Sequence, residues 1–393
     1  MASAASSGSS RWLTVGVSLI FASYFFGFGL FLPFFPVFLE QASFTPVQIA
    51  LFVAIPNIVK VVATPVATAL SDRAGRRRHS MAIYGLTCAV AFLSLLFLEG
   101  YWSILAVVLL LSVAIAPLQP LSDAYAYEAV KHQGINYGFT RSWGSAAFIG
   151  ATTFGGWYLG VFSAKGLQFF TAIGFIAMAA VALLSPGMPS ENGGEKKISP
   201  WKTEEFKSFG LHSILLAAGL ILGSMAALYS FGSLYWIEHG VADDVVGLLW
   251  SFGVISEIVV FLLGAALVSR LGSLPLILIG GLAAMVRWVV FPQALEIPHA
   301  FALQALHGAS FGMVHIGLMA FLADKVPSKT LGSVQGLAGM YIGIVLGGSG
   351  LLAGWLYEIN PAYAFYAMTV VACAGLLVLF SMWSKISRLK SAF

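Results

Sequence analysis

Residues 71–78 read SDRAGRRR and form a short polar stretch between two long hydrophobic runs. Gly75 allows the backbone to turn tightly, and Asp72 is placed to contact a neighbouring helix N-terminus or a basic side chain. A basic turn between hydrophobic runs of this length indicates helices that cross a membrane. A loop whose charges only set the membrane topology would be equally basic. A functional role for this loop and a purely topological role therefore both stay open at this point.

The composition extends this interpretation to the whole chain. Its 393 residues are 59% apolar and 9% charged, with a mean hydropathy of +0.91, whereas a soluble domain has about 25% charged residues. Most hydrophobic runs reach about twenty residues, enough for a helix to cross a hydrocarbon core of about 30 Å. The shorter alternating pattern of outer-membrane strands is absent. The sequence predicts an all-α integral membrane protein.

Polar breaks divide the chain into twelve predicted spans. Their approximate limits are 12–39, 45–71, 79–98, 102–129, 138–162, 166–184, 209–237, 244–269, 274–293, 298–324, 330–357 and 361–383. The segment 185–208 is rich in Pro, Gly and charge, which is typical of a linker. We therefore predict an N-terminal six-helix half at 1–184, a cytoplasmic linker at 185–208 and a C-terminal six-helix half at 209–393.

The distribution of basic residues predicts the orientation. Sixteen Lys and Arg residues fall on one side of the spans, against Lys165 alone on the other side. Basic residues concentrate on the cytoplasmic side, so we expect both termini there. The same bias explains the formal net charge of +4, and we infer no nucleic-acid partner. The first ten residues lack a basic signal-peptide region, so we expect the first helix to stay in the mature protein.

The two predicted halves share a weak repeat. Glycines and a tryptophan of the fifth span recur 198 residues later in the eleventh: Gly138, Gly150, Gly156 and Trp157 correspond to Gly336, Gly348, Gly354 and Trp355. At an offset of 197, Arg73 and Gly75 correspond to Arg270 and Gly272. A parallel repeat of two six-helix halves is the architecture in which a midplane site is exposed to each side in turn.

Ionisable residues lie deep in several spans. Glu257, Arg287 and His307 occupy three successive spans of the second half, and Asp123 and Arg141 lie in the first half. A charge at the bilayer centre costs about 2.5–3.5 kcal/mol on the insertion scale. These residues therefore indicate a polar cavity, and a polar cavity inside a membrane protein indicates a transport path.

The loop at 71–78 resembles the loop between helices 2 and 3 of the major facilitator superfamily, usually written GxLxDRxGRR. Thr68 stands where the first glycine would be, while the remaining positions match: Leu70, Asp72, Arg73, Gly75, Arg76 and Arg77. The resemblance implies the major facilitator fold and a gating role for Asp72, Arg73, Gly75, Arg76 and Arg77.

Within that superfamily, the segments SYFFGFGLFLPFFPVFL (23–39), YGFTRSWGSAAF (137–148) and LLWSFGVISEIVVF (248–261) resemble the 3-phenylpropionate transporter branch. That branch is related to lactose permease, a proton–sugar symporter. Five residues fall at charged positions of that permease: Asp123, Arg141, Glu257, Arg287 and His307. The resemblance implies proton-coupled transport through these side chains.

This chain differs from lactose permease at positions that bind the sugar or carry the proton in that permease. Ser310 stands where its proton-carrying carboxylate would be, Gln304 replaces a lysine, and Phe148 replaces the sugar-stacking tryptophan. The loss of that tryptophan argues against a simple sugar. Arg141 and Phe148 are seven residues apart and share a helix face, so we expect the substrate to meet a guanidinium beside an aromatic ring.

The deep charges give a small positive excess. Lys60, about twelve residues before the cytoplasmic loop, joins Arg141 and Arg287 against Asp123 and Glu257, which suits a small carboxylate. The predicted substrate-binding residues are Lys60, Asp123, Arg141, Phe148, Trp250, Arg287 and His307. The predicted proton-coupling residues are Glu257, with His307, and then Asp123.

Each of these residues has a structural alternative. Asp123 with Arg141, or Glu257 with Arg287, would also be explained as a fixed salt bridge. His307 would also be explained as a core histidine bonded to a backbone carbonyl. Aromatic side chains such as Phe148 and Trp250 are more often packing residues, and His315, eight residues after His307, favours packing as well.

No nucleophile elbow, HExxH, P-loop or paired cysteine motif is found in the sequence. We therefore expect neither an enzyme nor a cofactor or metal. The prediction is a monomeric, multi-pass transporter of the bacterial plasma membrane that imports a small aromatic or related organic acid with protons by alternating access. The alternatives are a symporter for a nucleoside, oligosaccharide or other polar solute, a proton-driven exporter, or a non-transporting membrane sensor.

Overall fold

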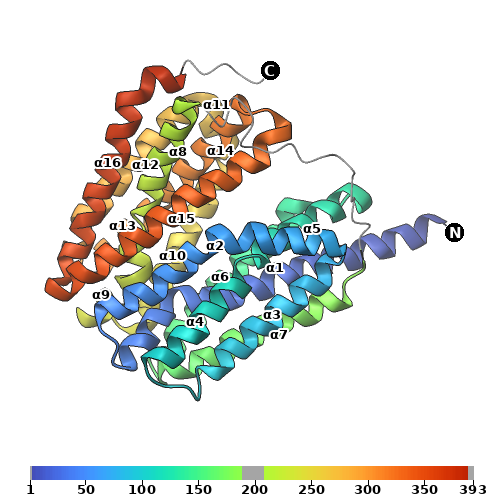
Figure 1. Ribbon diagram of the computed structural model, residues 1–393, viewed down its shortest axis with the longest axis horizontal. Helices are drawn as coiled ribbons and strands as arrows, with labels where there is room; N and C mark the ends of the chain where they lie inside the picture. Colours follow the sequence, from blue (N-terminus) through green and yellow to red (C-terminus); the bar gives the residue numbers. More distant parts are fainter. Residues whose placement is uncertain (1, 188–207, 388–393) are drawn as a thin grey trace. The chain divides into compact units, whose positions relative to one another are not determined.

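The computed structural model describes residues 2–187 and 208–387, with side chains from 11–187 and 208–386 (Figure 1). All regular secondary structure in these ranges is helical. Of the predicted linker at 185–208, residues 188–207 lie outside the described residues.

Helices cover the first six predicted spans. They are α1 (Ala2–Gln41), α2 (Pro46–Ala74), α3 (Arg77–Ser94), α4 (Tyr101–Ile115) with α5 (Leu118–Gln133), α6 (Tyr137–Leu159), and η1 (Ala164–Gly166) with α7 (Leu167–Leu184). The fourth span divides at Pro117, because proline lacks the amide hydrogen that a continuous helix would use.

Helices also cover the last six spans. They are α8 (Phe209–Gly223), η4 (Leu228–Gly232) and α9 (Ser233–Glu238), α10 (Asp243–Leu262) with α11 (Gly264–Leu271), α12 (Ser273–Val290) with η5 (Phe291–Gln293), α13 (Ile297–His307), η6 (Gly308–Met313) and α14 (Val314–Lys325), α15 (Ser328–Ile359) and α16 (Pro361–Ser387). Segments η4 and η6 are π-helical.

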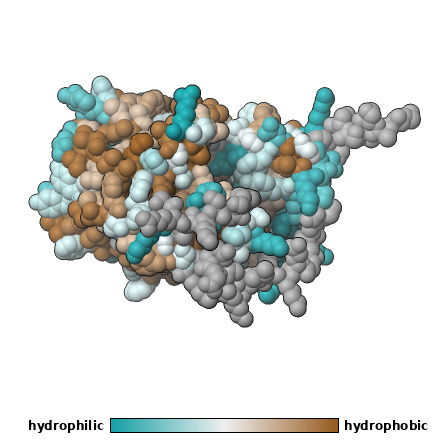
Figure 2. Space-filling view, turned by 90° about the horizontal axis from the view of Figure 1, so that it is seen from above, coloured by the Kyte–Doolittle hydropathy of each residue, from teal (hydrophilic) through white to brown (hydrophobic). Residues whose placement is uncertain are grey.

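Ten helical stretches of the described chain are long and apolar enough to cross a membrane. Helices α3 and α6 fill the other two predicted spans, and both begin with polar turns: RRHS in α3 and YGFTRS in α6. Much of the surface seen in Figure 2 is hydrophobic, as helices that face lipid require. The prediction of an all-α integral membrane protein is confirmed.

The described chain forms two compact units. Of the described residues, unit 1 draws on 2–44, 58–187 and 242–251, and unit 2 on 45–57, 208–241 and 252–387. In unit 1, α1 packs against α6 and α7, and α3 packs against α7. In unit 2, α8 packs against α15 and α16, and α12 packs against α14 and α16. Segments 45–57 and 242–251 begin the second and eighth predicted spans, at the repeat offset of 197 residues.

Glycines allow a close helix contact inside unit 1. A Cβ atom on Gly156 of α6 would lie 2.6 Å from the carbonyl oxygen of Asp243, and one on Gly247 would strike the carbonyl oxygen of Thr152. Next to this contact, the hydroxyl of Ser251 lies 2.7 Å from the Thr152 hydroxyl and 2.9 Å from the Thr153 hydroxyl. Small residues thus bring α6 and the start of α10 together, as small residues do at membrane helix interfaces.

Candidate functional site

Unit 2 brings together the three ionisable residues that the sequence places in successive spans. Glu257 lies on α10, Arg287 near the end of α12 and His307 at the end of α13. The Nε2 atom of His307 lies 2.7 Å from Oε1 of Glu257, and Arg287 Nη1 lies 2.8 Å from Nδ1 of His307. The imidazole therefore stands between the carboxylate and the guanidinium.

Arg287 is fully buried, and its partners are side chains of neighbouring helices. Its Nη2 group donates to Oε1 of Gln304, and its Nη1 group lies 3.4 Å from the sulfur of Met225. The guanidinium also lies 4.7 Å from the ring centroid of Trp288. Among the described residues, its buried Nε group has no hydrogen-bond partner. A buried guanidinium with an unused donor retains capacity to interact with an anion.

These partners assign the hydrogen positions on His307. Arg287 only donates hydrogen bonds, so Nδ1 of His307 accepts. A neutral imidazole carries one hydrogen, which therefore resides on Nε2 and is donated to Glu257. A second proton on His307 would break the bond from Arg287. Within this cluster, the group that can gain a proton with the hydrogen bonds intact is thus Glu257, through its second oxygen.

The charges of this cluster balance when Glu257 is ionised. The carboxylate and the guanidinium then compensate each other across a neutral imidazole. Two unit charges on opposite sides of an imidazole ring, about 7 Å apart, interact by about 2 kcal/mol at an effective dielectric constant of 20, so this compensation contributes to the stability of the site. Protonation of Glu257 would remove it and leave Arg287 as an uncompensated cation.

Two π-helical segments border the cluster. Segment η6 follows His307 directly and contains Ser310, and η4 contains Tyr229. Tyr229 interacts electrostatically with both Glu257 and Arg287. Single π-helical turns inside helices frequently mark functional sites. Here both segments lie next to the charged residues.

Unit 1 surrounds Arg141 of α6 with aromatic rings of α1. The guanidinium carbon lies 4.1 Å from the ring centroid of Phe25 and 5.5 Å from that of Phe21. The predicted juxtaposition of a guanidinium and an aromatic ring is present, but the ring is Phe25. Phe148 is 6% exposed and contacts Phe28 instead, at a centroid separation of 6.5 Å.

Asp123 of α5 accepts a hydrogen bond of 2.9 Å from the Tyr137 hydroxyl at the start of α6. Tyr137 stacks in turn on Tyr127, with centroids 4.7 Å apart and an interplanar angle of 8°. Among the described side chains, no ion pair within 4.0 Å joins Asp123 to Arg141. The fixed salt bridge considered for this pair is therefore absent, and the two groups interact electrostatically at longer range.

The other predicted binding residues differ in accessibility. Lys60 lies on α2 and is half-buried. Trp250 is 5% exposed, and it belongs to the segment of α10 that packs in unit 1, whereas Glu257 belongs to unit 2. Trp250 and Phe148 thus present little free ring surface in this structure.

In the predicted gating loop, the side chain of Arg77 contacts two carboxylates. Arg77 donates to Oδ1 of Asp72 through Nε at 3.1 Å and Nη2 at 2.9 Å, and it forms an ion pair with Glu128 of α5. Gly75 has a φ of 61°, a left-handed conformation that favours glycine. The prediction that Asp72 contacts a basic side chain is confirmed. Arg73 and Arg76 are exposed.

The contacts in this cluster differ from two alternatives that the sequence left open, a histidine bonded to a backbone carbonyl and a direct Glu–Arg salt bridge. His307 contacts Glu257 and Arg287 rather than a backbone carbonyl, and Glu257 and Arg287 are joined through it rather than directly. The sequence interpretation missed Gln304, Phe25 and Tyr137 as partners. Gln304 precedes His307 by three residues, a helical spacing, but the partners Phe25 and Tyr137 depend on how helices pack.

The sequence of this chain matches a known family of membrane proteins. A family model described as the MFS_1 like family matches residues 16–368. The chain belongs to this family. It is therefore a multi-pass membrane transporter of the major facilitator superfamily, and it is not an enzyme.

Relatives of this MFS transporter cover nearly its full length. The chain is 28% identical over 382 residues to the probable 3-phenylpropionic acid transporter of Escherichia coli (strain K12), covering 94% of this chain and 97% of the relative. It is 26% identical over 365 residues to the maltose permease of Geobacillus stearothermophilus, covering 90% and 91%. The crystal structure of the nucleoside transporter NupG, in its D323A mutant, matches with a TM-score of 0.81 at 17% identity, covering 95% of this chain and 99% of NupG.

Proposed function

We propose that this MFS transporter is a proton-coupled symporter that imports a small aromatic or related organic acid, resembling phenylpropionate, by alternating access. The observation that carries the proposal is the Glu257–His307–Arg287 arrangement, with contacts of 2.7 and 2.8 Å. The 28% identity to a probable 3-phenylpropionic acid transporter supports the substrate class.

The charge balance of this arrangement explains the coupling. A proton on Glu257 leaves Arg287 uncompensated, so an organic anion is attracted more strongly to the protonated transporter. By linkage, a bound anion favours protonation of Glu257 by the same factor. Proton and anion therefore bind and leave together, and one proton with one monovalent anion carries no net charge across the membrane.

The substrate in this mechanism meets cations and aromatic rings of unit 1. Lys60 and Arg141 attract its carboxylate, and Phe25 with Phe21 supplies the ring surface beside the Arg141 guanidinium. Phe148 and Trp250 support the site through packing rather than through a free ring face. His307 orients Glu257, and Asp123, bonded to Tyr137, is the second group for proton coupling.

The basic residues favour cytoplasmic termini in the bacterial plasma membrane, with the protein acting as a monomer. In this orientation the loop of Asp72, Arg73, Gly75, Arg76 and Arg77 is cytoplasmic, where its Arg77 contacts stabilise one conformation of α2, α3 and α5. The gating role of the loop follows from breaking and reforming these contacts during transport.

Uptake of labelled 3-phenylpropionate into proteoliposomes with imposed gradients tests the proposal. An inward proton gradient should drive accumulation, whereas an electrical potential alone should have little effect because the coupled step is electroneutral. Accumulation driven by the potential with no dependence on pH would refute proton coupling. A screen of benzoate and cinnamate as competitors tests the acid class.

A second candidate is symport of a nucleoside, an oligosaccharide or another polar solute. The paired hydrogen-bonding groups of Asp123 and Tyr137 favour it, since such groups suit sugar hydroxyls. A neutral solute that competes with 3-phenylpropionate at lower concentration, and is itself accumulated, would select this alternative.

A further inference from the structure

In unit 2, one face of α10 and α11 lies opposite one face of α13, η6 and α14, and the two faces continue past the Glu257–His307 contact. On α10 and α11, Glu257, Phe261 and Ala265 follow at four-residue spacing, and on the opposite side His307 is followed at the same spacing by Phe311 and His315. Residues four apart share a helix face. The two faces therefore meet at Glu257–His307 and again at Phe261–His315, whose ring centroids are 6.2 Å apart.

The two imidazoles lie in one aromatic stack. Phe311 is nearly parallel to both rings: its centroid is 5.6 Å from His307 at 11° and 5.9 Å from His315 at 10°. His307 is held at both ring nitrogens by Glu257 and Arg287. His315 interacts electrostatically with Glu257, no hydrogen bond to its ring nitrogens is found among the described residues, and its side chain lines a groove.

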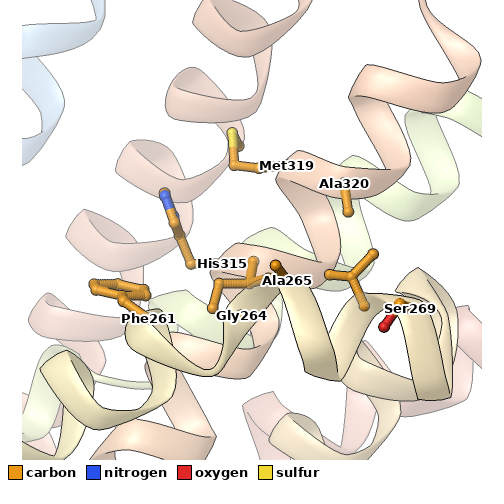
Figure 3. Close-up of a pocket in the computed structure, with 9 residues that line it drawn as sticks. Phe261, Gly264, Ala265, Ser269, His315, Met319 and Ala320 are labelled. Carbon is orange, nitrogen blue, oxygen red and sulfur yellow. The ribbon is translucent and has the colours of Figure 1, made fainter. Parts of the chain in front are cut away.

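A groove of about 660 Å³ begins at Phe261 and His315. Figure 3 shows His315 and Met319 on one wall, with Phe261, Gly264, Ala265 and Ser269 on the other. Three of the lining residues are small, Gly264, Ala265 and Ala320, which leaves room for the groove. His315 is the only one of its nine lining residues with an ionisable imidazole, carboxyl or amine.

The groove runs toward the basic ends of its helices. Arg270 lies near the end of α11, and Lys325, paired with Asp324 at 2.8 Å, ends α14. The positive-inside rule assigns these ends to the cytoplasm. The lining on α10 and α11 runs from Phe261 to Ser269, about 12 Å of helix, and it begins one helical turn after Glu257 on the side of the cytoplasmic ends.

We propose that His315 and this groove carry the proton of Glu257 to the cytoplasm, an inference that rests on the proposed proton symport. The O–H bond of protonated Glu257 breaks, its proton passes through intervening water molecules, and an N–H bond forms on His315. The imidazolium then gives the proton to water in the groove, which restores neutral His315 and leaves Glu257 ionised. The charged and titratable groups around His315 are Glu257, His307 and Arg287 on one side, and Arg270, Asp324 and Lys325 at the far end.

The test uses proteoliposomes that contain the full chain and a pH-sensitive dye. Wild type, His315→Ala and the control His299→Ala are compared, since His299 is an exposed histidine on the same span, with 65% of its side chain accessible. Substrate exchange at equal pH on both sides is measured beside substrate-driven acidification of the lumen. His315→Ala should keep exchange within about twofold and lose at least tenfold in acidification rate, and imidazole in the lumen should restore that rate.

A structural role for His315 would give different results. Acidification at the wild-type rate in His315→Ala overturns the inference, and so does joint loss of exchange and acidification without rescue by imidazole. Ala320→Leu, which narrows the groove from the opposite helix, should also slow acidification more than exchange, and equal slowing of both contradicts the path. If the wild-type protein transports substrate without acidifying the lumen, the proposed proton symport is itself wrong. This outcome differs from failure of the His315 path alone, in which wild type and His315→Ala both acidify the lumen at the same rate.

Discussion

The Nε2 atom of His307 lies 2.7 Å from Oε1 of Glu257, while Arg287 holds the other ring nitrogen at 2.8 Å. This geometry makes His307 a fixed donor to the carboxylate. Ser310, three residues after His307, carries no carboxyl group. In this chain the carboxyl group bonded to the histidine comes from α10.

Replacement of Glu257 by Gln should abolish accumulation of substrate while exchange across the membrane continues. The amide oxygen of Gln still accepts the hydrogen bond from His307, but the side chain no longer gains or loses a proton. Counterflow and proton-driven uptake in proteoliposomes measure the two activities. Glu296→Gln is the matched control, because Glu296 lies 3.5 Å from His299 in an exposed Glu–His pair. Uphill uptake by Glu257→Gln would exclude Glu257 as the proton carrier.

Removal of the Arg287 charge should destabilise the protein. Arg287→Met leaves the half-buried Glu257 without its compensating cation, a change that costs up to about 3–5 kcal/mol in fully buried ion pairs. The double variant Glu257→Gln/Arg287→Met should recover most of that loss, because no charge is left uncompensated. Thermal unfolding in detergent measures both variants. Equal instability of the single and double variants would contradict the charge balance.

Substitution of Phe25 should weaken substrate binding. Phe25→Leu removes the ring that lies 4.1 Å from the Arg141 guanidinium, and a cation–π contact contributes about 0.5–2 kcal/mol. Without it, Arg141 loses its fixed position, and we expect about a two- to thirtyfold weaker affinity in competition assays. Phe25→Tyr retains an aromatic face and serves as the control. An unchanged affinity in Phe25→Leu would show that this ring does not position the guanidinium.

Arg77 should be the most sensitive arginine of the loop. Arg77→Gln loses charge-assisted bonds to both Asp72 and Glu128, each typically contributing about 1.5–3 kcal/mol. Transport rate and thermal stability should fall more than in Asp72→Asn or Glu128→Gln, each of which leaves one bond. Arg73→Gln, at an exposed position, should lower the transport rate less than Arg77→Gln does. An Arg73 variant as impaired as the Arg77 variant would favour a purely topological role for the basic loop.

Gly247 should tolerate no larger side chain. A Cβ atom there would strike the Thr152 carbonyl oxygen and lie 3.0 Å from Cα of Gly156, so Gly247→Leu forces α6 and α10 apart. We expect a transport rate at least tenfold lower with normal insertion into the membrane. Gly150→Ala on α6, where no atom lies within 4 Å of an added Cβ and the backbone does not have a positive φ, is the control for loss of a glycine.

Much of the fold follows from the sequence because hydrophobic run length directly reflects bilayer thickness. Every predicted span contains a helix, and the grouping of Glu257, Arg287 and His307 follows from the cost of isolated charges in lipid. The π-helical segments at Tyr229 and Ser310 have no comparable signal, because they depend on local hydrogen-bond register. The choice of Phe25 rather than Phe148 beside Arg141 depends on how α1 packs against α6, which spacing within one helix does not determine.

Arg77 ties the loop to Glu128, and Glu128 follows Asp123 by five residues on the same helix, α5. About 7.5 Å of helix separates those two carboxylates along the axis, too short a rod to bend appreciably. Any tilt of α5 that adjusts Asp123 toward a ligand must also pull on the salt bridge at Glu128. A displacement of Asp123 is therefore transmitted through α5 to Arg77 and the loop.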